Sequence, residues 1–99
     1  MKLFAGLILL LSMSTFAATK VDCVAGDLKF TVTAVSSNDV RVTFRGETVQ
    51  ADGILSGDEV DLVARFSTIG EMTLFAKVGK VAPENYIFTQ GQRNSVVCR

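Results

Sequence analysis

Four acidic residues in one short stretch are the part of this sequence best suited to chemistry: Asp52, Asp58, Glu59 and Asp61. Oxygen-rich loops can hold calcium, although the spacing from Asp52 to Asp61 does not follow the EF-hand pattern. Two of the carboxylates could instead act as general acid and base if they converged in a pocket. The third interpretation is a solvated loop, and we favour it because nothing in the sequence indicates that any of these acids is buried.

Histidine is absent from the sequence, and its absence limits the chemistry that the chain can carry. It removes the commonest general base and the commonest metal ligand. It also excludes Ser-His-Asp and Cys-His nucleophile systems. No glycine-rich segment has the spacing of a phosphate-binding loop. We therefore expect a protein that is not an enzyme and that needs neither a cofactor nor a metal ion.

Basic residues are not in excess, since 10 Lys and Arg stand against 10 Asp and Glu. Nucleic acid is therefore not an expected partner, because nothing in the chain would neutralise its phosphates. Arg41, Arg45 and Arg65 fall on outward positions of the predicted strands, where they could form a stripe for an anionic partner. Charges on an exposed sheet face more often pair across strands and protect the sheet edges from aggregation, and we favour that interpretation.

Residues 1–17 have the order of a secretory signal peptide, with a lysine, an apolar run and then small residues. The alternative is a retained membrane anchor, which we disfavour because a spanning helix needs ~20 apolar residues. Cleavage after Ala17 suits signal peptidase, because it places the small residue Thr15 at the −3 position relative to the cleavage site. We therefore predict one domain, residues 18–99, that is periplasmic or secreted and has no membrane span.

Cys23 and Cys98 are the cysteines of the chain, and both lie in the part that we expect to be exported. An oxidising compartment makes a disulfide the expected state, with two free thiols as the alternative. Closing so long a loop would stabilise a small domain by about 4–5 kcal/mol in the chain-entropy model. The bridge would also require the first and last strands to lie side by side or nearly so.

Alternation of apolar and polar residues with a period of two dominates the predicted mature chain. Short strands separated by turns indicate an all-β fold, a small antiparallel β-barrel or sandwich, and the terminal disulfide favours the barrel. Residues 52–59 are the most loop-like stretch of the chain, and residues 91–94 are expected to form the last turn. The predicted inward residues are Leu28, Phe30, Val32, Ala34, Val40, Val42, Phe44, Val60, Leu62, Ala64, Phe66, Met72, Leu74, Ala76 and Val78.

Several short patterns occur along the chain in the order typical of one family. They are residues 23–26 (Cys-Val-Ala-Gly) before a strand, the predicted hairpin at residues 40–49, the pair Ser56 and Gly57, and residues 70–74 (Gly-Glu-Met-Thr-Leu). In these features the chain resembles the periplasmic and membrane-bound inhibitors of C-type lysozyme. The resemblance spans most of the mature chain, and it implies a small antiparallel β-barrel with cysteines near both ends.

The resemblance also implies a protein partner, a C-type lysozyme, and a binding site on two neighbouring loops. In that family a serine and a lysine from these loops enter the lysozyme cleft and engage its acidic residues. By position the serine is Ser56, followed by Gly57, while the lysine position before Gly70 holds Ile69. These four residues are the expected binding residues. The alternative function is an envelope interaction or structural protein without inhibitory activity, in which Ser56 is an ordinary turn serine.

Overall fold

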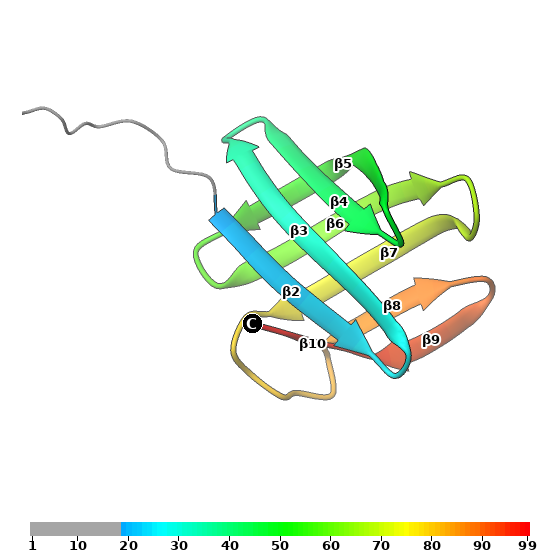
Figure 1. Ribbon diagram of the computed structural model, residues 1–99. Helices are drawn as coiled ribbons and strands as arrows, with labels where there is room; N and C mark the ends of the chain where they lie inside the picture. The colour runs from blue at the N-terminus through cyan, green and yellow to red at the C-terminus, as the bar shows by residue number, and fades with distance from the viewer. Residues whose placement is uncertain (1–18) are drawn as a thin grey trace, which may run out of the picture.

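The computed structural model describes residues 19–99, so the predicted signal peptide, residues 1–17, lies outside the described residues. Strands joined by short turns make up the described chain (Figure 1). Within residues 19–99 no helix is long and apolar enough to cross a membrane. The strands are β2 Thr19–Ala25, β3 Leu28–Ser36, β4 Asp39–Phe44, β5 Glu47–Ser56, β6 Glu59–Phe66, β7 Gly70–Lys77, β8 Tyr86–Thr89, β9 Gln92–Ser95 and β10 Val97–Cys98.

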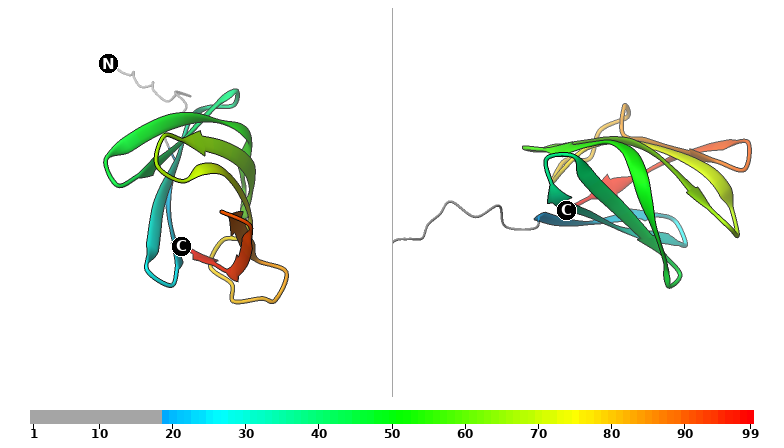
Figure 2. Two further views of the ribbon diagram at one scale, coloured as in Figure 1. Left: turned by 90° about the vertical axis from the view of Figure 1, so that its right-hand side faces the viewer. Right: turned by 90° about the horizontal axis from the view of Figure 1, so that it is seen from above.

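These strands form an antiparallel sheet that curls into a nearly closed barrel (Figures 1 and 2). The strand order is β10-β2-β3-β4-β5-β6-β7-β8-β9, so the last strand, β10, lies beside β2. Cys98 of β10 is directly opposite Cys23 of β2, and their sulfur atoms form a disulfide. The predictions of a small antiparallel β-barrel and of the terminal disulfide are therefore confirmed, and the first and last described strands are neighbours.

The barrel has two halves, because β5 changes its partner part-way along. Residues 47–51 pair with β4, whereas residues 52–56 pair with β6. The first sheet contains β10, β2, β3, β4 and residues 47–51, and the second sheet contains residues 52–56 and β6 to β9. Gly53 lies at the bend with a φ of 149°, a backbone conformation that other residues rarely adopt. The chain returns to the first sheet at Val96, between β9 and β10.

One side of each long strand faces a continuous apolar core, as the alternation predicted. Phe30 stacks on Phe44 with ring centroids 4.6 Å apart, and Phe66 packs edge-on against Phe44 at 5.6 Å. Such aromatic pairs add to the stabilisation from burial. Leu28 and Val78, also predicted to face inward, are only partly buried. The buried hydrophobic residues are Val21, Cys23, Ala25, Phe30, Val32, Ala34, Val40, Val42, Phe44, Ala51, Val60, Leu62, Ala64, Phe66, Met72, Leu74, Ala76, Ile87, Val96 and Cys98.

Two segments that the sequence predicted as loops are strands. Residues 52–56 are the second half of β5, so the predicted loop at residues 52–59 shrinks to a turn at Gly57 and Asp58. Residues 92–95 form β9, and the turn before it consists of Gln90 and Gly91. These two turn residues have φ of 53° and 77°, which matches the twist of a tight hairpin. Apolar alternation could not reveal β9, because all of its residues are exposed.

Asn85 is a fully buried polar residue that organises the connection between β7 and β8. Its side-chain carbonyl accepts a hydrogen bond from the Lys77 amide at 3.0 Å, and its side-chain amide donates to the Lys80 carbonyl at 3.0 Å. We expect Asn85→Ala to lower the free energy of unfolding by about 1–3 kcal/mol, because two backbone groups would lose their partner. Urea unfolding measures this loss. The exposed neighbour variant Glu84→Ala is the control, and equal stability of the two variants would contradict this role of Asn85.

Candidate functional site

The predicted binding residues lie at two turns that the structure does not bring together. Ser56 and Gly57 are exposed at the β5–β6 turn, whereas Ile69 and Gly70 lie at the β6–β7 turn. Between the turns runs β6, whose 8 residues separate them by about 25 Å at the usual rise of a strand. Consecutive turns of an antiparallel sheet lie at opposite ends of the strand that they share. The expectation that these loops are neighbours is therefore wrong.

The turn that contains Ile69 is held against the barrel. Ile69 is partly buried against the core. The neighbouring Ser67 donates hydrogen bonds from its amide and its hydroxyl to the Glu47 carboxylate, at distances of 2.8 to 3.1 Å. Glu47 begins β5, so these bonds tie the β6–β7 turn to the β4–β5 turn. A turn tethered in this way supports the barrel. The hollow that could bind a partner lies instead at the end of β6 that is next to Ser56.

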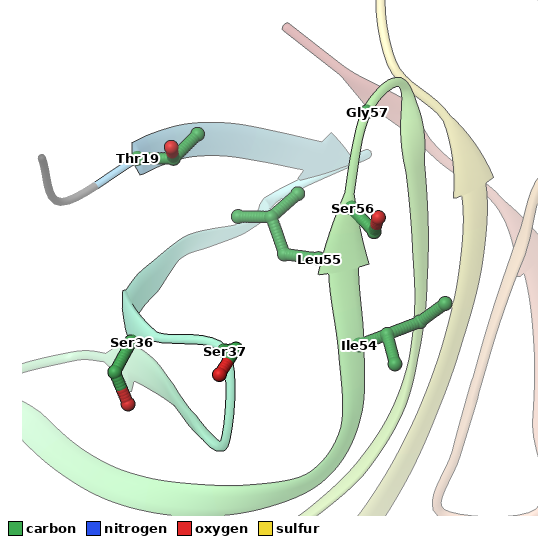
Figure 3. A pocket seen from close by; sticks show the side chains of 7 residues that line it. All are labelled: Thr19, Ser36, Ser37, Ile54, Leu55, Ser56 and Gly57. Carbon is green, nitrogen blue, oxygen red and sulfur yellow. The ribbon is translucent and has the colours of Figure 1, made fainter. Parts of the chain in front are cut away.

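A pocket of about 480 Å³ opens beside Ser56 (Figure 3). It lies between the end of β5, the turn from β3 to β4 and the start of β2. Hydroxyl groups and two aliphatic side chains surround it. We call it the β5 pocket, and its lining residues are Thr19, Ser36, Ser37, Ile54, Leu55, Ser56 and Gly57.

The β5 pocket exists because β5 extends beyond β4. Ala51 pairs with Val40, and β4 begins only one residue earlier, at Asp39. Within residues 19–99, no strand pairs with residues 52–56 on the side that faces away from β6. We call this side of residues 52–56 the β5 edge. In Figure 3, Leu55 points across the gap towards β2 and β3, whereas Ser56 points to the other side of the strand. The unpaired backbone of such an edge can accept another strand.

Glu59 lies opposite Ser56 in the β5–β6 hairpin, and its charge is balanced by Lys77. Lys77 Nζ donates a hydrogen bond to the Glu59 carboxylate at 3.0 Å. This hydrogen bond and the attraction between the two charges raise the pKa of Lys77 above its ordinary value. The stabilisation is thus fully present at neutral pH and is lost only when strongly alkaline pH deprotonates Lys77. Asp58, at the tip of the turn, is also anchored, because its carbonyl accepts a hydrogen bond from the Val78 amide at 2.6 Å.

The other charged residues considered from the sequence do not build a second site. In the part of the chain that the structure describes, no three His, Cys, Asp or Glu side chains gather where they could hold a metal ion. Arg41 pairs with Asp39 at 2.8 Å, and Arg65 pairs with Glu71 at 3.0 Å. The favoured interpretation, pairing across strands, is therefore confirmed for Arg65, which lies opposite Glu71 of β7. Arg41 instead pairs within its own strand, since Asp39 also belongs to β4.

A second pocket of about 480 Å³ lies beside the disulfide, against Asp22, Val24, Val97 and Arg99. Its strand edge is already occupied. The Asp22 amide donates to the Arg99 carbonyl at 2.9 Å, and the Arg99 amide donates to the Asp22 carbonyl at 2.8 Å. The β5 pocket is therefore the stronger candidate, because it combines a hollow with an unpaired strand edge.

Only one side of the β5 pocket was predicted from the sequence. Ser56 and Gly57 were predicted as binding residues, but Thr19, Ser36 and Ser37 were not. The pattern Ser-Ser-Asn-Asp at residues 36–39 is typical of a turn, yet it does not indicate what the turn faces. What the turn faces depends on how many residues β5 extends beyond its pairing with β4. The alternation of apolar and polar residues does not define that number.

No protein-family model matches this chain, and neither the curated proteins nor the solved structures contain a match to it. Its class is defined by its own structure: a small, disulfide-closed antiparallel β-barrel. The candidate site of this barrel is a hydroxyl-lined pocket beside an unpaired strand edge.

Proposed function

We propose that this protein is an exported, non-enzymatic binding protein that holds an extended segment of a partner protein along the β5 edge. The observation that carries the proposal is the unpaired stretch of residues 52–56 beside the β5 pocket. The disulfide between Cys23 and Cys98 supports an oxidising compartment, periplasmic or extracellular, as the place of action.

Strand addition is the binding mode that fits such an edge. The backbone of the partner would hydrogen-bond to the edge, and its alternate side chains would enter neighbouring pockets. Five residues of strand span ~17 Å, which suits a short peptide segment. Native proteins often protect an exposed edge with lysine or proline, and residues 52–56 contain neither. The β5 edge therefore lacks two common devices that prevent pairing.

The surroundings of the edge favour a segment with small polar or aliphatic side chains. Leu55 offers an apolar contact, and the hydroxyls of Ser36 and Ser37 can donate or accept hydrogen bonds. Among residues 19–99, no charged residue lines the pocket, so a buried charge of the partner would find no counter-charge from this part of the chain. The barrel also fixes the edge before binding, which reduces the entropy lost on association.

C-type lysozyme is the specific partner suggested by the family resemblance, and one contact favours it. The Ser56 hydroxyl is exposed at the hairpin and could donate to a carboxylate in the lysozyme cleft. The negative charge of Glu59, beside Ser56, would repel the lysozyme carboxylates. This charge is balanced by Lys77, whose Nζ lies 3.0 Å from the Glu59 carboxylate. Ile69 has no part in this proposal, because its turn lies at the far end of β6.

Amide hydrogen exchange of the purified, disulfide-bonded protein tests the proposal, with C-type lysozyme and an array of extended peptides as ligands. A bound ligand should protect the amides of residues 52–56, because they would pair with a new strand. Ser56→Arg should weaken binding about tenfold or more, corresponding to ~1.4 kcal/mol, because it adds a bulky cation at the end of the β5 edge. Thr68→Arg, at the exposed turn beyond the other end of β6, is the matched control and should bind normally.

Each alternative has a distinct result. Protection confined to the β6–β7 turn, or loss of binding in Thr68→Arg alone, would contradict the β5 edge as the site. Unchanged muramidase activity at micromolar concentrations of this protein would remove lysozyme as the partner. If neither lysozyme nor any peptide protects residues 52–56, strand addition is wrong.

A further inference from the structure

The outer face of the first sheet is polar. Asp22, Thr31, Thr43 and Thr48 lie opposite one another across four neighbouring strands. The Thr31 hydroxyl donates to Asp22 at 3.1 Å, and the hydroxyls of Thr43 and Thr48 lie 2.7 Å apart. A face of this kind is typical of an antiparallel sheet that is covered by water.

The outer face of the second sheet carries aromatic and apolar side chains among its charged residues. Phe75 of β7 lies opposite Tyr86 of β8, with ring centroids 6.3 Å apart. Phe88 follows Tyr86 by two residues on the same side of β8 and is 45% exposed, while Ile54 on β5 is 46% exposed. Large apolar side chains exposed on one face often mark an interaction site. We call this surface the aromatic face, and its apolar members are Ile54, Val63, Phe75, Tyr86 and Phe88.

Charges of opposite sign flank the aromatic face. Asp52 lies exposed on β5, at one side, whereas Asp61 lies exposed on β6 within the face, opposite both Ile54 and Phe75. Arg93 lies exposed on β9, at the other side, with its guanidinium 4.8 Å from the centroid of the Tyr86 ring. Among the described residues, none of these three charges takes part in an ion pair. Within residues 19–99, the Arg93 side chain makes one hydrogen bond, which it donates to the Pro83 carbonyl at 3.4 Å.

This arrangement is self-complementary under a two-fold rotation. The rotation exchanges the two sides of the face, so that Arg93 of one copy comes opposite Asp52 and Asp61 of the other. From Asp52 on β5 to Arg93 on β9 there are four strand spacings, or ~19 Å. Val63, Thr73 and Phe88 lie between these two charges in the same row. Two such faces would bury their apolar centres against each other and pair the charges at both sides.

We propose that a second copy of this chain packs on the aromatic face, sheet against sheet, to form a two-fold symmetric dimer. The dimer gives each flanking charge a partner that it lacks in a single copy, and it removes the exposed Phe88 from water. On the outer face of the first sheet, the acidic residues Asp22 and Asp39 already accept hydrogen bonds from Thr31 and Arg41 of the same copy. The inference is independent of the proposed function, because it is tested at residues that do not line the β5 pocket.

Sedimentation velocity of the purified, disulfide-bonded protein, from micromolar to millimolar concentration, tests the proposal. The unmodified protein should shift from monomer to dimer within this series. Arg93→Glu and Asp61→Arg should each weaken dimerisation about tenfold or more, because each places like charges opposite one another. An equimolar mixture of the two variants should restore it, since the mixed pair has opposite charges at both sides of the interface.

Two further variants separate the aromatic face from the rest of the surface. Phe88→Lys should abolish dimerisation, whereas Val24→Lys should not change it, because Val24 is similarly exposed, at 43%, on the outer face of the first sheet. Far-ultraviolet circular dichroism confirms that each variant is folded. A protein that stays monomeric to millimolar concentration would overturn the proposal. So would a variant mixture that associates no better than its components, or an equal loss in Phe88→Lys and Val24→Lys.

Discussion

A Cys23→Ala/Cys98→Ala double variant is expected to lose about 4–5 kcal/mol of unfolding free energy. The disulfide joins residues 75 positions apart in the sequence, so it removes many conformations from the unfolded chain. A domain of this size buries a modest share of its surface, and its total stability is of the same order as this loss. We expect the variant to be largely unfolded at room temperature.

Urea unfolding followed by circular dichroism measures this loss, and a control isolates the contribution of the bridge. Val24→Ala/Val97→Ala changes the neighbouring cross-strand pair and keeps the disulfide, and it should cost about 1–2 kcal/mol, since neither side chain is fully buried. If the cysteine variant proves as stable as the valine control, backbone pairing of β2 with β10 is sufficient to close the barrel, and the bridge is not its main constraint.

Gly53→Ala is expected to have the second largest effect, a loss of about 3–5 kcal/mol from combined overpacking and backbone strain. A Cβ atom on Gly53 would lie 2.5 Å from the Leu62 Cα and 2.6 Å from the Leu62 Cβ, and the φ of 149° is unfavourable for alanine. The atoms in the way belong to the backbone and stem of β6, so no flexible side chain can move aside. We expect β5 to lose its bend and the second sheet to loosen.

Gly57→Ala is the matched control for this prediction. Gly57 also has a positive φ, 61°, but no atom lies within 4 Å of the position that its Cβ would take. Its loss should therefore be only about 1 kcal/mol, the conformational penalty alone. Thermal unfolding of the two variants gives the comparison, and losses of similar size would show that close packing at the bend of β5 is not the decisive factor.

Much of the fold followed from the sequence because the core is built from regular alternation. The rows at Phe30, Val42 and Leu62 face inward as predicted, and Cys23 pairs with Cys98. Where apolar and polar residues do not alternate, the strands were not predicted. The four residues of β9 are all polar and exposed. In residues 52–56 the apolar pair Ile54 and Leu55 is consecutive and follows Gly53 at a bend. A strand at such a place is held by its neighbours and not by an apolar face of its own.

The candidate site was less predictable, because it depends on which turns share an end of the barrel. Ser56 and Ile69 are separated by the length of β6, as the register shows. Ser36 and Ser37 approach Ser56 because β4 is shorter than β5. Phe75 stands between Leu74 and Ala76, which were predicted to face inward. An apolar residue at the outward position between them was the signal for the aromatic face. The positions of the other site residues depend on the lengths of the strands and on which strands are neighbours. A pattern of period two predicts neither.

The position of β10 has a consequence for the biosynthesis of this protein. The strand that seals the barrel follows all the other described strands in the chain, yet its partner β2 is the first of them. A fold that depends on so distant a contact has a high contact order and forms slowly, on the scale of milliseconds to seconds. A chain that stops short of Cys98 would leave the Cys23 thiol unpaired and exposed to thiol-reactive quality control.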